Sequence, residues 1–182
     1  MKIMLRPLFT FLAVAALFVA GLAQAQTYYA RTTGGSTTNW NQNTTWSTAN
    51  CTGAAAAGIP GAGNPVQICS GKTVNVNIAG AQSAALTFVN GNANSTLNLD
   101  SGATLTVNGN ATISTSNNNR VRTIALANSS TLTVTGNLTL DSNTGTNRDT
   151  NLTVTDATAI VNGNLVLQDC NATGSASRAT VG

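Results

Sequence analysis

The sequence predicts an all-β protein, a parallel β-helix of about four three-stranded coils with an N-terminal cap. One segment occurs three times without a gap, at residues 103–113, 130–140 and 157–167, and places Gly109, Gly136 and Gly163 at intervals of 27 residues. Such a period is typical of a solenoid, whose repeats stack on one another. Within each copy, apolar residues alternate with Thr, Asn or Ser, which predicts strands with one buried face.

Stacking the three copies predicts the residues of the core. Four inward ladders result: Leu105, Leu132 and Ala159; Val107, Val134 and Val161; Ala111, Leu138 and Leu165; Ile113, Leu140 and Leu167. A single coil cannot bury these side chains, so stability must come from the stack. Asn110, Asn137 and Asn164 follow the repeated glycine, where we expect their side-chain amides to bond along the axis.

A further strand precedes each copy. Residues 97–107 match residues 66–76 position for position, through a shared Ser-Gly step, and this match predicts coil starts at Val66, Leu97, Ile124 and Leu152. A fifth start is expected at Ala179, close to the last residue, Gly182. We therefore expect a C-terminal remainder that this sequence lacks.

The first 25 residues have the pattern of a secretory signal peptide. Lys2 and Arg6 precede an apolar run, and Ala23-Gln-Ala25 is a small-x-small cleavage signature. The alternative is an uncleaved membrane anchor, for which the run is short. We expect a secreted or cell-surface protein without stable membrane insertion after cleavage.

Residues 26–65 differ from the repeats of residues 66–182 and are predicted to form the cap. Trp40 and Trp46 have two interpretations, a cover over the open end of the core, which we favour, and a sugar-stacking pair. Cys51 and Cys69 bracket a Pro-containing loop, and we expect them to form a disulfide in an oxidising compartment. Cys170 has no partner within this chain, and it is either free or paired with residues that the sequence lacks.

Composition excludes several kinds of chemistry. Charged residues make up 7% of the chain and His is absent, which excludes His-based catalysis and, with isolated cysteines, a zinc site. We expect no catalytic residue, no cofactor and no metal. The few basic residues are scattered, so nucleic acid is not an expected partner.

Two groups of residues are candidate ligand surfaces. Thr104, Thr106, Thr131 and Thr133 form a Thr-x-Thr array like that of ice-binding solenoids. The other group is three arginines that occupy the same loop in successive coils, as an anion-binding patch or as ordinary soluble loop residues: Arg120, Arg122 and Arg148.

The order of these features resembles a known class of protein. The signal peptide, Asn39-Trp40, Thr44-Thr45-Trp46, Gly58-Ile59-Pro60, residues 66–76 and the Thr-Leu-Thr-Val-x-Gly-Asn repeats are similar to the N-terminal region of exported bacterial adhesin-like β-helix proteins. Some of those belong to the mannose-sensitive haemagglutinin pilus system. The resemblance implies a surface or adhesion role, with glycans or proteins of a host or neighbouring cell as partners.

Three functions follow as hypotheses. The leading one is a non-enzymatic extracellular module of an adhesin-like protein, serving as a stalk or display scaffold. The alternatives are a carbohydrate-active β-helix enzyme, a lyase or hydrolase that would need grouped Asp, Arg or Lys residues, and an ice-binding protein acting through its Thr-rich face.

Overall fold

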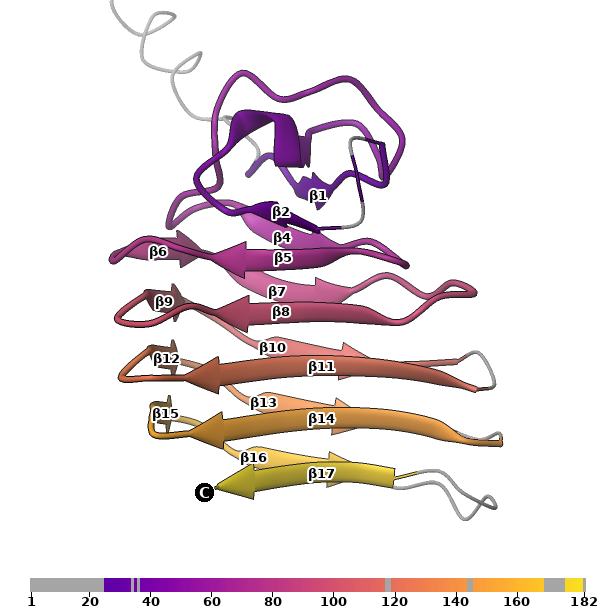
Figure 1. The fold of residues 1–182 in the computed structure, drawn as a ribbon, viewed down its shortest axis with the longest axis vertical. Helices are drawn as coiled ribbons and strands as arrows, with labels where there is room; N and C mark the ends of the chain where they lie inside the picture. The colour runs from indigo at the N-terminus through magenta and orange to yellow at the C-terminus, as the bar shows by residue number, and fades with distance from the viewer. Residues whose placement is uncertain are drawn as a thin grey trace, which may run out of the picture.

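The computed structural model describes residues 25–33, 35, 37–116, 119–143, 146–168 and 176–181. Its strands stack as rungs of a parallel β-helix beneath an N-terminal cap (Figure 1). Three sheets run along the axis, and each complete coil contributes one strand to each sheet. The fold class predicted from the sequence is confirmed.

The three sheets are built from strands that range from two residues in β3 to eight in β11 and β14. Sheet A contains β3 (Trp46–Ser47), β1 (Tyr28–Ala30), β4 (Pro65–Ile68), β7 (Ala85–Phe88), β10 (Ala111–Ser114), β13 (Leu138–Asp141) and β16 (Leu165–Gln168), in that spatial order. Sheet B contains β2 (Thr37–Asn39), β5 (Thr73–Val76), β8 (Ser95–Leu99), β11 (Arg120–Ala127), β14 (Arg148–Thr155) and β17 (Ala176–Val181). Sheet C contains β6 (Ala81–Ser83), β9 (Thr104–Val107), β12 (Thr131–Val134) and β15 (Thr158–Val161).

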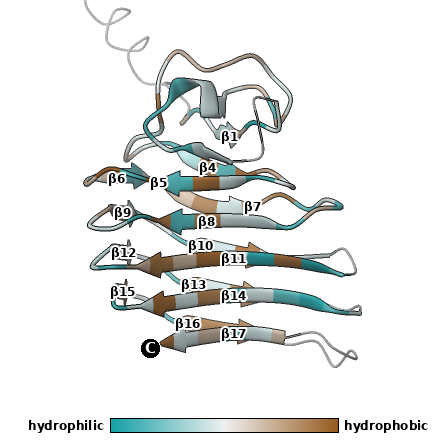
Figure 2. Ribbon diagram, viewed as in Figure 1, coloured by the Kyte–Doolittle hydropathy of each residue, from teal (hydrophilic) through white to brown (hydrophobic). Residues whose placement is uncertain are grey.

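All four predicted ladders are present in register. Leu132 pairs with Leu105 on one side and Ala159 on the other, and Leu140 pairs in the same way with Ile113 and Leu167. Buried and outward residues alternate along the strands because successive side chains point to opposite faces. The alternation of hydropathy is visible along the strands in Figure 2.

The predicted alignment of the first coil is wrong by one strand. Val66 lies in β4 of sheet A, where it pairs with Leu86, whereas Leu97 lies in β8 of sheet B and pairs with Val74. The strand–Ser-Gly–strand pattern occurs at two different corners of the helix, because a tight turn between two half-buried strands needs the same residue types at either corner. The predicted further coil is present: Ala179 pairs with Leu152 as expected, although its strand, β17, begins three residues earlier at Ala176.

The residues of the cap also extend the stack. β1 pairs with β4 and β2 pairs with β5, both in parallel, so the segment before Pro65 adds a partial coil. A turn of 3-10 helix (η2, Asn43–Thr45) and the antiparallel strand β3 complete the cap. Among the described residues, η2 is the only helical segment.

The lengths of the corners differ in a regular way. From sheet C to sheet A the spacing varies by only one position: Val107 to Ala111, Val134 to Leu138 and Val161 to Leu165 each span four positions, and Ser83 to Leu86 spans three. From sheet A to sheet B, which we call the A–B corner, the spacing between inward residues is six from Ile68 to Val74 and twelve from Leu140 to Leu152. Length variation is thus concentrated at one edge of the helix, on the right in Figure 1.

Candidate functional surfaces

The outward threonines of sheet C form two rows along the axis. Thr131 pairs with Thr104 on one side and with Thr158 on the other, while Thr106 pairs with Thr133. The rows are short, because Ile160 follows Thr133 and Gln82 precedes Thr106. In addition, the Thr104 hydroxyl accepts a hydrogen bond from the backbone N–H of Gly80 at 2.6 Å. The predicted Thr array exists, with two complete Thr-x-Thr rungs.

Trp40 and Trp46 are fully buried in the cap. Their rings meet edge to face with centroids 4.8 Å apart, and Trp46 Nε1 donates to the Trp40 carbonyl at 2.8 Å. Both belong to the continuous core that runs down the coils. The structure confirms them as the cover of the core, and it rules out the sugar-stacking interpretation because neither ring is accessible.

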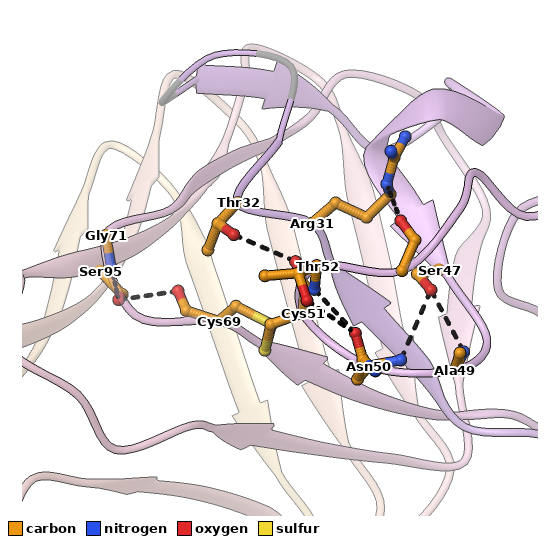
Figure 3. The surroundings of a disulfide bond; sticks show 11 residues. Arg31, Thr32, Ser47, Ala49, Asn50, Cys51, Thr52, Cys69, Gly71 and Ser95 are labelled. Atoms are coloured by element: carbon orange, nitrogen blue, oxygen red, sulfur yellow. Dashed lines mark hydrogen bonds between the residues drawn. A yellow bond between two sulfur atoms is a disulfide. The ribbon is translucent and has the colours of Figure 1, made fainter.

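The disulfide joins the cap to the coils, as predicted. Cys51 and Cys69 are bridged with their Cα atoms 5.8 Å apart (Figure 3). The bridge is held on both sides: the Cys51 carbonyl accepts from the Thr32 N–H, and the Cys69 carbonyl accepts from the Ser95 hydroxyl at 3.0 Å. Cys69 lies at the A–B corner and not at the corner occupied by Asp100, which the shifted alignment had suggested. Cys170 lies outside the described residues.

The three candidate arginines have different surroundings. Arg122 is fully buried and points inward; it donates to the carbonyls of Ala93 and Gly91, the latter at 3.1 Å. It is therefore not part of an exposed patch, which corrects the prediction. Arg120 and Arg148 are half-buried and are register partners at the starts of β11 and β14. The structure thus brings two of the three side by side at the A–B corner.

Burial lowers the pKa of the two inward-facing cations, Arg122 and Lys72. Burial lowers the pKa of Arg122, and the charge of nearby Arg120 lowers it further. Lys72 is equally buried and donates from Nζ to the Gly35 carbonyl. Its pKa is lowered by burial and, secondly, by Arg31. Lys72 thereby binds a carbonyl of a cap loop. Arg122 binds two carbonyls of the loop that joins β7 to β8 at the A–B corner.

Sequence reasoning missed the structural role of Lys72 and Arg122, although the alternation of inward and outward residues along their strands indicates that both point inward. Lys72 is two positions before the inward Val74, and Arg122 is two positions before the inward Ile124. The neighbouring coils carry hydroxyl residues at the positions in register with Arg122, namely Ser95 and Thr150. The A–B corner therefore has a polar interior, in contrast to the apolar ladders.

Carboxylates do not converge among the described residues. Asp149 pairs with Arg178 at 3.5 Å, and Asp141 accepts from the Asn143 N–H at 2.8 Å within its own turn. Asp100 and Asp156 lie in the turns that follow β8 and β14. Within the described ranges there is no group of three or more His, Cys, Asp or Glu that could hold a metal ion.

Searches for similar proteins found no match: no protein-family model, no curated protein and no solved structure matches the chain. In the part of the chain that the structure describes, no helix is both long and apolar enough to span a membrane.

Proposed function

We propose that this chain is a non-enzymatic extracellular module of an adhesin-like surface protein, in which the β-helix serves as a display scaffold. The observation that carries the proposal is the contrast between corners. The corner from sheet C to sheet A varies by one position, from three to four, whereas the A–B corner lengthens from six to twelve positions. A rigid stack with variable loops along one edge suits recognition, because binding residues are commonly carried on loops that a rigid scaffold positions.

The distribution of acidic groups supports a binding role over hydrolysis or elimination. Glycoside hydrolysis commonly needs two carboxyl groups on either side of one bond. Here Asp141 is engaged within its own turn and Asp149 with Arg178, while Asp100 and Asp156 lie at the same corner after β8 and β14, with the strand β11 between those two strands. The disulfide supports an oxidising compartment and hence export.

Surface attachment tests the proposal directly. Beads coated with the chain purified after its predicted signal peptide should adhere to cells or glycan surfaces, and the same protein should release no reducing ends or unsaturated sugars from polysaccharides. Turnover that is abolished by substitution of an Asp residue would overturn the non-enzymatic assignment.

Ice binding is the second candidate, and it rests on the register of the sheet C threonines. The array has only two full Thr-x-Thr rungs, and Ile160 and Gln82 interrupt the second row. Thermal hysteresis that is lost in Thr131→Tyr, with the melting temperature retained, would establish ice binding in place of adhesion.

A further inference from the structure

The last rung of the β-helix, formed by β15, β16 and β17 at the end opposite the cap, leaves inward apolar side chains open to solvent (Figure 1). Three of its inward residues are 47%, 48% and 81% exposed: Leu165, Leu167 and Val181. Their register partners in the preceding coil are all buried: Leu138, Leu140 and Val154. Apart from these three, the large apolar side chains exposed in the described part of the chain are Ile59 in the cap and Ile160 in β15. Exposed apolar surface gathered in one place commonly marks an interaction site.

The outward face of the same rung also carries apolar residues where the preceding coils carry threonine. Ile160 is in register with Thr133, and Val166 is in register with Thr139. One coil earlier the same two positions are again threonine: Thr106 and Thr112. An outward threonine keeps a hydroxyl group in water, whereas an apolar side chain there gains free energy when protein covers it. The two replacements therefore favour a last rung that is covered.

Three strand edges lie beside these side chains. β15, β16 and β17 are the last strands of sheets C, A and B, so each pairs with a described strand on one side only. An edge strand presents N–H and C=O groups that are a template for a strand of another chain. In this sequence only Gly182 follows β17, and one residue cannot form a further coil. Three strand edges around an apolar centre are matched by another rung of the same kind, which a second copy of this chain supplies.

The closed N-terminal end restricts how a second copy can bind. Trp40 and Trp46 are buried in the cap over the core at that end, so the two ends of the helix are not complementary and do not suit a head-to-tail stack. Two last rungs can meet instead across a two-fold axis perpendicular to the helix axis. In such an isologous contact both copies use the same surface, and the strands that meet run antiparallel.

The strand lengths select one of the possible two-fold axes. An axis through the corner between sheets C and A places β15 opposite β16 of the partner subunit, with four residues in each, and places β17 opposite itself. The axes through the other two corners would pair the six residues of β17 with the four residues of β15 or of β16. The first axis alone matches every strand with one of its own length.

This axis also matches the side chains of β15 and β16. Residues directly opposite each other in antiparallel strands point to the same face of the sheet. Val161 then lies opposite Leu165 of the partner subunit, and Ala159 lies opposite Leu167 of the partner subunit, so inward apolar residues meet. The outward residues that face each other are the two that replace threonine: Ile160 and Val166 of the partner subunit.

Polar residues lie at the margins of the same contact. Thr158 is opposite Gln168 of the partner subunit, at the ends of β15 and β16. For β17, a register centred on Ala179 places Arg178 opposite Thr180 of the partner subunit, so the two Arg178 charges do not face each other. The contact therefore brings no like charges opposite each other.

We propose that two copies of this chain associate end to end through β15, β16 and β17, with a cap at each far end of the resulting rod. The contact buries the exposed inward side chains of both last rungs and pairs the backbone groups of all three edge strands. This association is independent of the display function, because it depends only on the last rung.

Light scattering after size-exclusion chromatography tests the association, on the predicted mature chain with Cys170→Ser so that no intermolecular disulfide contributes. We expect twice the mass of one chain, and small-angle X-ray scattering should give a maximum dimension about twice that of a monomer. The double variant Leu167→Lys, Val181→Lys should be monomeric, because the contact would bury unpaired charges. The matched control is Ile59→Lys, which places lysine at an exposed apolar site of the cap and should remain dimeric.

Charges at the rim test the register without altering the apolar centre. Thr158→Lys with Gln168→Lys places like charges opposite each other, whereas Thr158→Glu with Gln168→Lys places opposite charges there. We expect sedimentation equilibrium to give a several-fold higher dissociation constant for the first variant than for the second. Equal dissociation constants would refute the register.

Each remaining outcome overturns the association as described. A monomeric parent chain would leave the last rung to coils of a longer chain or to another partner. A dimer that persists in the double Lys variant of Leu167 and Val181, or that dissociates in Ile59→Lys, would place the contact elsewhere. A larger open assembly would exclude a two-fold contact.

Two further measurements keep the interpretations separate. Circular dichroism melting in dilute solution distinguishes loss of association from loss of fold, and the melting temperature of the parent chain should rise with protein concentration while that of the monomeric variant should not. Adhesion by a parent chain that is monomeric would refute the dimer and leave the display function standing. A dimer that does not adhere would refute the display function alone.

Discussion

Asn110 Oδ1 accepts a hydrogen bond from the backbone N–H of Asn137, 2.9 Å away in the next coil. The same bond joins Asn137 to Asn164 at the same distance. The predicted bonding of these amides along the axis is confirmed, and the donor in both bonds is the backbone N–H of the next coil. The reason is the preceding glycine, which lets neighbouring coils approach so closely that the backbone itself comes within reach.

We predict that Gly136→Ala destabilises the stack through this contact. A Cβ on Gly136 would meet Asn110 Oδ1 and would lie 2.8 Å from the carbonyl carbon of Gly109, a distance that requires backbone movement. The expected cost is about 1–3 kcal/mol in the free energy of unfolding, measured by urea denaturation. Gly63→Ala is the control, because its Cβ would meet nothing within 4 Å and stability should be retained.

The ladder that contains Leu140 and Leu167 allows the energetic effect of burial to be compared for the same residue type. Leu140 is fully buried, whereas Leu167, its partner in the next coil, is 48% exposed. Leu140→Ala should cost about 2–5 kcal/mol through lost burial and a cavity, and Leu167→Ala should cost less than half as much. Thermal melts of the two variants make the comparison, and equal losses would contradict the register of sheet A.

Reduction of the disulfide should loosen the cap. The Cys51–Cys69 bridge closes a loop with a sequence separation of 18 residues, for which the chain-entropy estimate is roughly 3 kcal/mol. We expect the paired variant Cys51→Ser, Cys69→Ser to melt lower than the oxidised protein and to be insensitive to reductant. If dithiothreitol lowered the melting temperature of that variant as much as that of the unmodified protein, the bridge would not explain the effect.

The buried Lys72 should make stability depend on alkaline pH. Burial, and secondly Arg31, lower its pKa in the folded state below the ordinary value, so the unfolded chain binds more protons between the folded and the ordinary pKa. Stability therefore rises with pH across that window, up to about 10.5, where the unfolded lysine also deprotonates.

The measurement is the difference in melting temperature between the unmodified protein and Lys72→Met at several pH values. That difference should grow as pH rises from 8 to about 10.5, because the cost of the charge is relieved while the neutral amine still donates to Gly35. A difference that is constant with pH would show that Lys72 is not strained by its burial.

The apolar ladders could be predicted because period-two alternation and a fixed repeat length together leave one register. Shifting Leu132 by one residue against Leu105 would turn its whole strand inside out. The disulfide could also be predicted, although the corner assigned to Cys69 was wrong, since closeness along the chain and a single bracketed loop restricted its partner.

What the sequence determined by itself is the solenoid, its inward ladders and the glycine corners, because each depends on residue types repeated at a fixed spacing. Only the tertiary structure decided that Val66 belongs to sheet A, that Arg122 is buried while Arg120 and Arg148 lie side by side, and which group satisfies each Asn. The A–B corner varies in length, so periodicity fixes no alignment there. The position of a side chain at this corner depends instead on which loop carbonyls of the neighbouring coils need a hydrogen-bond donor.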